Sequence, residues 1–204
     1  MDTCLTDLRE ISSLASWTVS TYKPSCGVSA LRHPSPSYFW QSDGPQPHLL
    51  NIHFFKLVAI VRLRIYLDFE LDESYTPTRL VFCAGTSEYD LAEFAEWGWG
   101  REREDGVEEA GPSGWVDVPL DAVGGGEGEG EGGVLRCMVL QVRVCENHQN
   151  GKDTHVRGVQ IFARAVGFEE MGEGKEGMEE RRLESWAAES GIEDADWMGE
   201  PVLR

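Results

Sequence analysis

The segment Val61-Arg-Leu-Arg-Ile-Tyr-Leu-Asp68 alternates apolar and polar side chains without a break. Successive side chains of an extended strand point to opposite faces, so this period of two gathers Val61, Leu63, Ile65 and Leu67 on one face. The other face carries arginine, tyrosine and aspartate, which tolerate contact with water. The segment therefore predicts a β-strand with one buried face, as in an antiparallel sheet that is covered on one side.

The same alternation recurs elsewhere in the chain. The further segments that predict strands are 50–54, 80–84, 116–120, 134–144 and 159–163. Turn-forming residues separate most of them, notably Ser42-Asp-Gly44 and Asn150-Gly151. Because many short strands occur with few helical patterns, we predict an all-β fold, an antiparallel β-sandwich.

The chain has 204 residues and a formal net charge of −18. Most acidic residues lie in three segments, 88–110, 121–133 and 167–204, and the rest of the chain is close to neutral. Nucleic-acid binding relies on clustered lysine and arginine that displace counterions, so we expect no nucleic-acid partner. The acidity belongs to insertions and a tail rather than to the predicted sandwich.

Acidic, glycine-containing segments interrupt the strand pattern near 97–110 and 121–133, and we expect them to be loop insertions. From Gly167 onward glycine and glutamate dominate and aliphatic residues become rare, a composition typical of disorder. We therefore predict one domain over residues 1–166 and a disordered acidic tail over residues 167–204.

The five cysteines form no CxxC pair, so neither a zinc site nor a disulfide framework is indicated. Residues 1–10 are polar and charged, unlike a signal peptide. No apolar stretch approaches the roughly 20 residues that are needed to span a bilayer. These observations predict an intracellular chain with reduced cysteines and without a membrane partner.

The loop Asn147-His-Gln-Asn-Gly-Lys-Asp-Thr-His155 places amide, imidazole and carboxylate groups together between two strand patterns. A connection that only reverses the chain needs little more than Asn-Gly, whereas these groups could also hydrogen-bond a ligand. The alternative interpretation is structural. In it, Asn150-Gly151 makes a tight turn, and Asp43 and Asp72 satisfy local backbone groups.

Histidines near this loop suggest a metal site as a further hypothesis. His148, His155 and Asp153, with His48 or His53, are the candidate ligands, but their spacing matches no established metal motif. The chain also lacks the GxSxG signature of a serine nucleophile. We therefore expect no metal, no cofactor and no catalytic residue.

Four blocks of the sequence carry a family resemblance: Trp40–Phe54, Asp72–Pro77, Gly111–Leu120 and Asn147–His155. In this order, over about residues 8–165, they resemble the DOC domain of the destruction-box receptor subunit of the anaphase-promoting complex. The resemblance implies a β-jelly-roll of the galactose-binding type, which agrees with the strand pattern. It also implies a non-catalytic subunit of a ubiquitin ligase that acts in the nucleus and cytoplasm.

The resemblance further implies that loops at one end of the sandwich bind the destruction-box degron of a substrate together with a WD40 coactivator. Such joint binding would increase the processivity of ubiquitination. The residues to which the resemblance assigns degron binding are Ser42, Asp43, Asp72, Glu73, Ser74, Asn147, His148, Gln149, Asn150 and Asp153. The C-terminal Leu203-Arg204, where the family often has Ile-Arg, would dock to a tetratricopeptide-repeat subunit of the scaffold.

The alternative function is a binding module of the same fold with another ligand, either a carbohydrate or a peptide within a different ubiquitin ligase. Sugar sites usually include a stacking aromatic side chain, and the loop 147–155 has none. An enzyme such as a metal hydrolase is a third hypothesis, which stoichiometric bound zinc would support.

Overall fold

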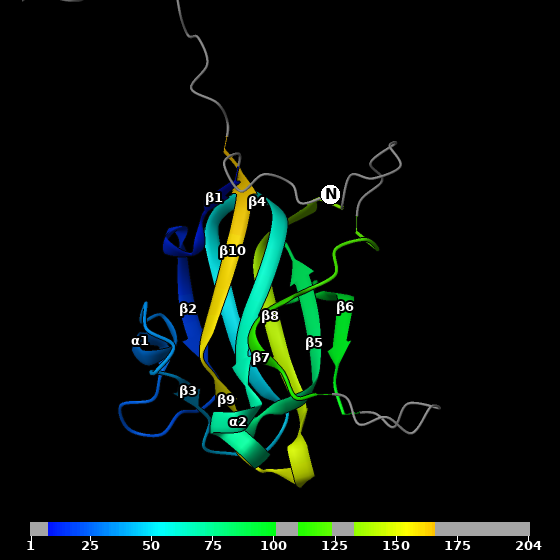
Figure 1. Ribbon diagram of the computed structural model, residues 1–204. Coiled ribbons are helices and arrows are strands. Elements are labelled where there is room, and N and C mark those ends of the chain that lie inside the picture. The colour runs from blue at the N-terminus through cyan, green and yellow to red at the C-terminus, as the bar shows by residue number, and fades with distance from the viewer. Residues whose placement is uncertain (1–7, 101–109, 124–132, 166–204) are drawn as a thin grey trace, which may run out of the picture. The chain divides into compact units, whose positions relative to one another are not determined.

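The longest strand, β4 (His48–Asp68), links the two layers of the fold in the computed structural model, which describes residues 8–100, 110–123 and 133–165 (Figure 1). Its first half pairs with β2 (Ala15–Val19) and β8 (Leu135–Asn147). Its second half pairs with β10 (Gly158–Arg164) and β7 (Ser113–Asp117). Figure 1 shows the strand rising in cyan, arching over, and returning in teal.

Each layer is an antiparallel sheet. The first layer continues from β8 to β5 (Pro77–Gly85) and then to the edge strand β6 (Ala92–Gly98). The second layer ends at β1 (Leu8–Glu10), which pairs with β10. A separate small sheet joins β3 (Trp40–Gln41) to β9 (His155–Val156). This arrangement confirms the predicted β-sandwich of the jelly-roll type.

The helical elements are short. They are α1 (Val28–Leu31), α2 (Phe69–Asp72) and the 3-10 turns η2 (Ser12–Leu14), η3 (Glu73–Tyr75) and η4 (His148–Asn150). None of the described helices is long and apolar enough to cross a membrane.

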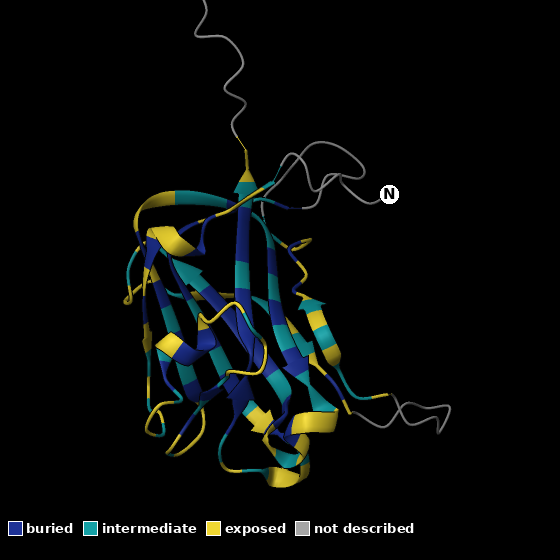
Figure 2. Ribbon diagram, turned by 60° about the vertical axis from the view of Figure 1, so that its left-hand side comes forward, coloured by how far each residue is buried: buried dark blue, intermediate teal, exposed yellow. Residues whose placement is uncertain are grey.

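Buried residues alternate with more exposed ones along the strands (Figure 2), and the buried apolar residues form one core cluster. Among the most deeply buried of these are Leu50, Ile52, Phe54, Leu63, Ile65, Leu67, Leu80, Phe82, Leu140, Val142, Val144 and Ile161. Each contributes about 1.5–3 kcal/mol of transfer free energy when it leaves water. The core is therefore the part of the protein that the strand pattern of the sequence specifies most directly.

The structure differs from the predicted strand boundaries in two places. The segments 50–54 and 61–68, predicted as separate strands, are halves of β4, and the register shift between His53 and Val58 marks the bend. The segment 116–120 overlaps β7 only at its start, although Val118 still donates its N–H to the carbonyl of Leu63 at 2.9 Å.

The insertion predicted near 97–110 begins later than expected. Trp97 and Gly98 complete β6, and Trp99 is only 7% exposed. The indole N–H of Trp99 donates to the carbonyl of Ala110 at 3.1 Å, so both ends of this connection belong to the fold. Residues 101–109, most of the predicted insertion at 121–133 and the predicted tail at 167–204 lie outside the described residues.

Candidate functional site

Three loops meet at one end of the sandwich: 42–47, 69–75 and 147–154. The side-chain N–H of Gln46 donates to the carbonyl of Gly151 at 3.0 Å, which joins the first loop to the third. A Cβ at Gly151 would overlap the backbone oxygen of Ser74, so the third loop can approach the second only because residue 151 is glycine. Residues that are up to about a hundred positions apart in the sequence thus form one surface.

The loop 69–75 begins with a capped helix. The carboxylate of Asp68 accepts a hydrogen bond from the N–H of Leu71 at 3.2 Å, which satisfies one of the free donors at the start of α2. The helix ends after one turn because Glu73 adopts a left-handed φ of 47°. Asp72 and Glu73 consequently point in different directions, although they are adjacent acidic residues.

Asp72 points inward and is 2% exposed. Its carboxylate accepts hydrogen bonds from Arg157 Nε at 2.8 Å and Arg157 Nη2 at 2.6 Å, and it also contacts His155 Nδ1 at 2.8 Å. We call Asp72, His155 and Arg157 the polar clamp. It ties the 69–75 loop to the connection between β9 and β10.

The clamp is closed on its outer sides by further contacts. The ring of His155 stacks on Tyr75 with centroids 4.3 Å apart, and Phe39 lies 4.2 Å away on another side. Burial would raise the pKa of Asp72, but the hydrogen bonds from His155 and Arg157 outweigh it and lower the pKa below its usual value. Asp72 is therefore an ionised group with a structural role, and its predicted contact with a degron stays a prediction.

Two other predicted contact residues are structural for the same reason. Ser42 is fully buried, and its Oγ accepts a hydrogen bond from the N–H of Thr154 at 2.8 Å. Asn147 is 5% exposed, and its Nδ2 donates to the carbonyls of Gly151 at 3.1 Å and Asp153 at 2.8 Å. These bonds hold the 147–154 loop in shape, and contact of either buried side chain with a degron stays a prediction.

Three of the predicted residues are partly engaged. His148 is half-buried, with its ring 5.0 Å from that of Phe69 and 5.3 Å from that of Trp99. Asp153 forms an ion pair with Lys23 at 2.8 Å, and this hydrogen bond raises the pKa of Lys23. The third, Ser74, is half-buried where the loops touch.

The remaining predicted residues are exposed. Gln149 and Asn150 adopt left-handed φ values of 51° and 57°, which residues other than glycine rarely do without support. Asp43 and Glu73 are exposed on the neighbouring loops. Their amide and carboxylate groups therefore face solvent on a backbone that the buried bonds hold in place.

The structure adds a residue that the sequence interpretation did not select. A hollow of about 460 Å³ lies between the 42–47 and 147–154 loops, and Lys152 is an exposed residue among its lining. We call Asp43, Glu73, Gln149, Asn150 and Lys152 the polar rim. Lys152 lies inside the loop that the sequence singled out, but no pattern indicated that its side chain faces the hollow.

The candidate metal ligands serve separate structural roles. His155 belongs to the clamp, His148 packs against aromatic rings, and His48 Nε2 lies 2.8 Å from the carbonyl of Lys152. Within residues 8–100, 110–123 and 133–165, no group of three His, Cys, Asp or Glu side chains is arranged to hold a metal ion. The predicted docking pair Leu203-Arg204 lies outside the described residues.

Comparison with known proteins identifies a family. The model of the family described as "Anaphase-promoting complex, subunit 10 (APC10)" matches residues 1–176. Anaphase-promoting complex subunit 10 of Drosophila melanogaster is 39% identical over 160 residues, which cover 78% of this chain and 73% of that protein. The Homo sapiens protein of the same name is 38% identical over 155 residues, covering 76% and 75%. Subunit DOC1 of Saccharomyces cerevisiae is 32% identical over 152 residues, covering 74% and 55%.

Solved structures confirm the fold. The family 32 carbohydrate-binding module of Clostridium perfringens NanJ, solved with galactose, has a TM-score of 0.56 and 10% identity, covering 76% of this chain and 99% of that one. A second C. perfringens module of family 32, solved with GalNAc-β-1,3-galactose, has a TM-score of 0.55 and 8% identity, covering 76% and 100%. At such identities the likeness shows a galactose-binding-like jelly-roll and nothing about the ligand.

Proposed function

The chain belongs to the anaphase-promoting complex subunit 10 family and has the role of a non-catalytic subunit of that complex, and from this premise we propose that it recognises substrates. In this proposal the polar rim binds the destruction-box degron of a substrate while a WD40 coactivator binds another side of it. The resulting complex would carry out more rounds of ubiquitination for each substrate encounter.

The observation that supports this proposal most strongly is the left-handed pair Gln149 and Asn150. Such a backbone costs free energy unless its surroundings hold it, and strained residues of this kind concentrate at ligand-binding sites. Here the side chain of Asn147 holds the loop from inside, so the exposed amides are preorganised. Preorganisation favours binding because little conformational entropy remains to be lost.

The chemistry of the rim suits an extended peptide. A peptide in extended form offers an N–H donor and a C=O acceptor at each residue. The carboxamides of Gln149 and Asn150 can both donate and accept, while Asp43 and Glu73 accept. The rim can therefore match peptide backbone groups without requiring one particular side-chain sequence.

A shared ligand explains how a non-catalytic subunit would affect the product. When two proteins hold one peptide, release requires both contacts to open, and the second contact acts at a high effective concentration. The substrate then dissociates more slowly, and more ubiquitin is added before it leaves. We also propose that Leu203-Arg204 docks to a tetratricopeptide-repeat subunit, because it pairs a branched apolar side chain with an arginine. The chain would accompany the complex in nucleus and cytoplasm.

The test is reconstitution of an anaphase-promoting complex that lacks its own subunit 10 with this chain. Ubiquitins added per binding event are counted on a destruction-box substrate. Gln149→Gly with Asn150→Gly removes both amides but permits the left-handed backbone, so that loss of side chains is separated from strain. We expect the wild type to restore processivity and the double variant to be incorporated without restoring it.

Glu88→Ala is the matched control, because this exposed residue follows β5, at the end of the strand away from the rim. It should behave as the wild type. A wild-type chain that is incorporated but has no effect on processivity would contradict degron binding. In that case we would favour the alternative function, in which a module of the same fold binds a carbohydrate or another peptide.

A further inference from the structure

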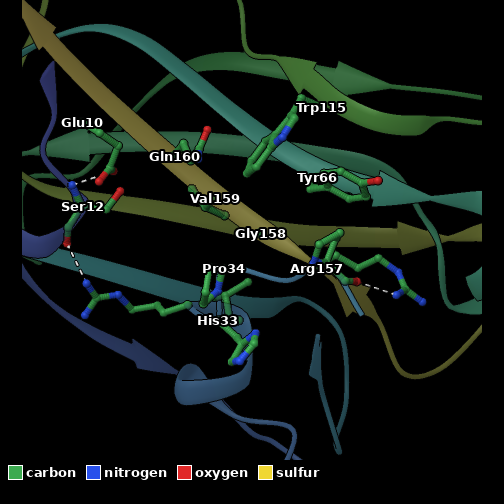
Figure 3. Close-up of a pocket in the computed structure, with 13 residues that line it drawn as sticks. Glu10, Ser12, His33, Pro34, Tyr66, Trp115, Arg157, Gly158, Val159 and Gln160 are labelled. Atoms are coloured by element: carbon green, nitrogen blue, oxygen red, sulfur yellow. Dashed lines mark hydrogen bonds between the residues drawn. The ribbon is translucent and has the colours of Figure 1, made fainter. Parts of the chain in front are cut away.

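A second hollow lies on the outer face of the layer formed by β1, β10, β4 and β7, and the proposed function does not use it. Its volume is about 200 Å³. Figure 3 shows Trp115 and Tyr66 on one side, His33 and Pro34 on the other, and β10 at Gly158 between them. We call it the Trp115 hollow.

The indole of Trp115 packs against its neighbours but remains 38% exposed. Tyr66 meets it edge to face with centroids 5.3 Å apart, and the guanidinium of Arg64 lies 4.7 Å over its ring. A Cβ at Gly158 would lie 3.0 Å from Trp115 Cη2, so this glycine lets the indole approach β10. A fixed, exposed tryptophan loses little entropy on binding, and such residues often dominate protein–protein interfaces.

The hollow also contains a hydrogen-bond donor that lacks an acceptor. Ser12 is 8% exposed, and its Oγ is buried without a partner in the described part of the chain. Arg32 Nη2 donates to the carbonyl of Ser12 at a long 3.5 Å, and its guanidinium lies 5.3 Å from the ring centroid of Trp17. Buried polar groups are normally satisfied, so the unpartnered Ser12 Oγ favours a ligand that brings an acceptor, and the exposed Arg32 is available to the same acceptor.

The charges around the hollow favour a negative acceptor. Arg32 lines it and Arg64 lies against its aromatic wall. Arg157 also lines it but is already neutralised within the polar clamp. Glu10 is the opposing carboxylate, and its Oε1 accepts the N–H of Ser12 at 2.9 Å. Arg64 Nε donates to Gln160 Oε1 at 2.7 Å and so keeps its full charge, and Glu10 is the one carboxylate among the residues that line the hollow, so the surroundings are positive on balance.

The size of the hollow decides what kind of ligand carries the acceptor. Sites for small molecules and cofactors usually enclose about 300–1,000 Å³, which is more than this hollow offers. Its volume of about 200 Å³ suits one or two side chains of a polypeptide. A protein segment is therefore the class of ligand that fits.

We propose that the Trp115 hollow docks a segment of another subunit of the anaphase-promoting complex, in which an aspartate or glutamate is adjacent to an apolar residue. The carboxylate accepts hydrogen bonds from Ser12 and Arg32, and the apolar side chain packs on Trp115 and Tyr66. The proposal rests on membership of the complex and not on degron binding. Because the hollow lies on a side of the sandwich and the rim at its end, both can be occupied together.

The test measures dissociation of the full chain from a reconstituted complex that otherwise lacks subunit 10, using displacement by excess labelled wild-type chain. Trp115→Ala should dissociate about 30-fold faster, as expected for an interface hot spot. Arg32→Glu should also dissociate faster, with a larger effect at low salt because the contact is ionic. Tyr89→Ala is the matched control, since Tyr89 is an aromatic that is 99% exposed in the connection after β5.

A photo-crosslinking residue in place of the exposed His33 identifies the neighbour, and we expect a crosslinked peptide with an acidic residue beside an apolar one. Wild-type dissociation rates for folded Trp115→Ala and for Arg32→Glu would overturn the proposal, as would a crosslinked segment without an acidic residue. Arg32 is exposed, so its variant decides the question if Trp115→Ala does not fold. The rim variant should lose processivity with unchanged dissociation, which distinguishes the two proposals.

Discussion

Asp72 and Glu73 are adjacent carboxylates with opposite environments. Asp72 is 2% exposed and belongs to the polar clamp, while Glu73 is exposed on the polar rim. The clamp contributes stability and orientation, whereas the rim contributes groups for a ligand. Polar residues in one loop can therefore be divided between folding and function. Variants of single residues should affect either stability or ligand binding, but not both.

The largest effect is expected from breaking the clamp. Asp72→Asn keeps the volume of the side chain but leaves the buried Arg157 without its counter-charge. Loss of one partner of a buried ion pair costs about 3–5 kcal/mol of unfolding free energy. Chemical denaturation of the variant measures this cost. Glu73→Gln is the control and should stay within about 0.5 kcal/mol of the wild type, as exposed substitutions do. Equal losses of unfolding free energy in Asp72→Asn and Glu73→Gln would refute the division between a structural and an exposed carboxylate.

Lowering the pH should reduce the contribution of the polar clamp to the unfolding free energy. The pKa of Asp72 is lower in the folded protein than in the unfolded chain. Its contribution is therefore complete above the unfolded pKa of about 3.9 and is lost as pH falls through the lower folded pKa. We expect the stability difference between wild type and Asp72→Asn to be constant near neutral pH and to shrink below about pH 4. Denaturation midpoints as a function of pH test this, and a difference that shrinks above pH 5 would contradict it.

A smaller effect is expected where the loops touch. Gly151→Ala would place a Cβ against the backbone oxygen of Ser74, so the backbone must move. Overpacking of this kind costs about 1–3 kcal/mol. Gly44→Ala is a matched control on the same end of the sandwich, because its Cβ would meet only the side chain of Thr21, at 3.1 Å. Thermal unfolding should show a clear loss for the first variant and a slight one for the second, and the reverse order would be inconsistent with the loop packing.

The smallest effect on stability is expected at the rim itself. Gln149→Gly with Asn150→Gly removes exposed side chains and relieves left-handed strain, so each change should alter the unfolding free energy by no more than about 0.5 kcal/mol. Denaturant titration of the same preparation used for ubiquitination provides the comparison. A large loss of stability would assign these residues to the structural group, next to Asn147.

The sandwich could be predicted from the sequence because alternation is a local signal. Leu63 and Ile65 are buried for the same reason that their spacing indicates. The bend within β4 could not be predicted, since it depends on which strands pair on each side of Val58. The burial of Trp99 could not be predicted either, because its acidic surroundings in the sequence give no sign of its contact with Phe69.

The sequence predicted that the three loops lie together more successfully than it predicted which of their side chains are exposed. The loop 147–155 does lie beside the 42–47 and 72–74 segments. Its division into buried and exposed side chains could not be predicted, because the burial of Asp72 depends on Arg157, 85 positions away. Degron contact at the exposed residues stays a prediction until the ubiquitination assay is done.

One strand, β4, supplies hydrogen bonds to both layers. Neither layer can open fully without disturbing this shared strand, which couples them as a single cooperative unit. Amide hydrogens at Ile52 and Ile65, which lie in opposite halves of β4, should therefore exchange with solvent through the same global opening and with the same free energy. Loop amides should exchange earlier. The protein would thus keep its binding end adaptable while the sandwich behind it unfolds only as a whole.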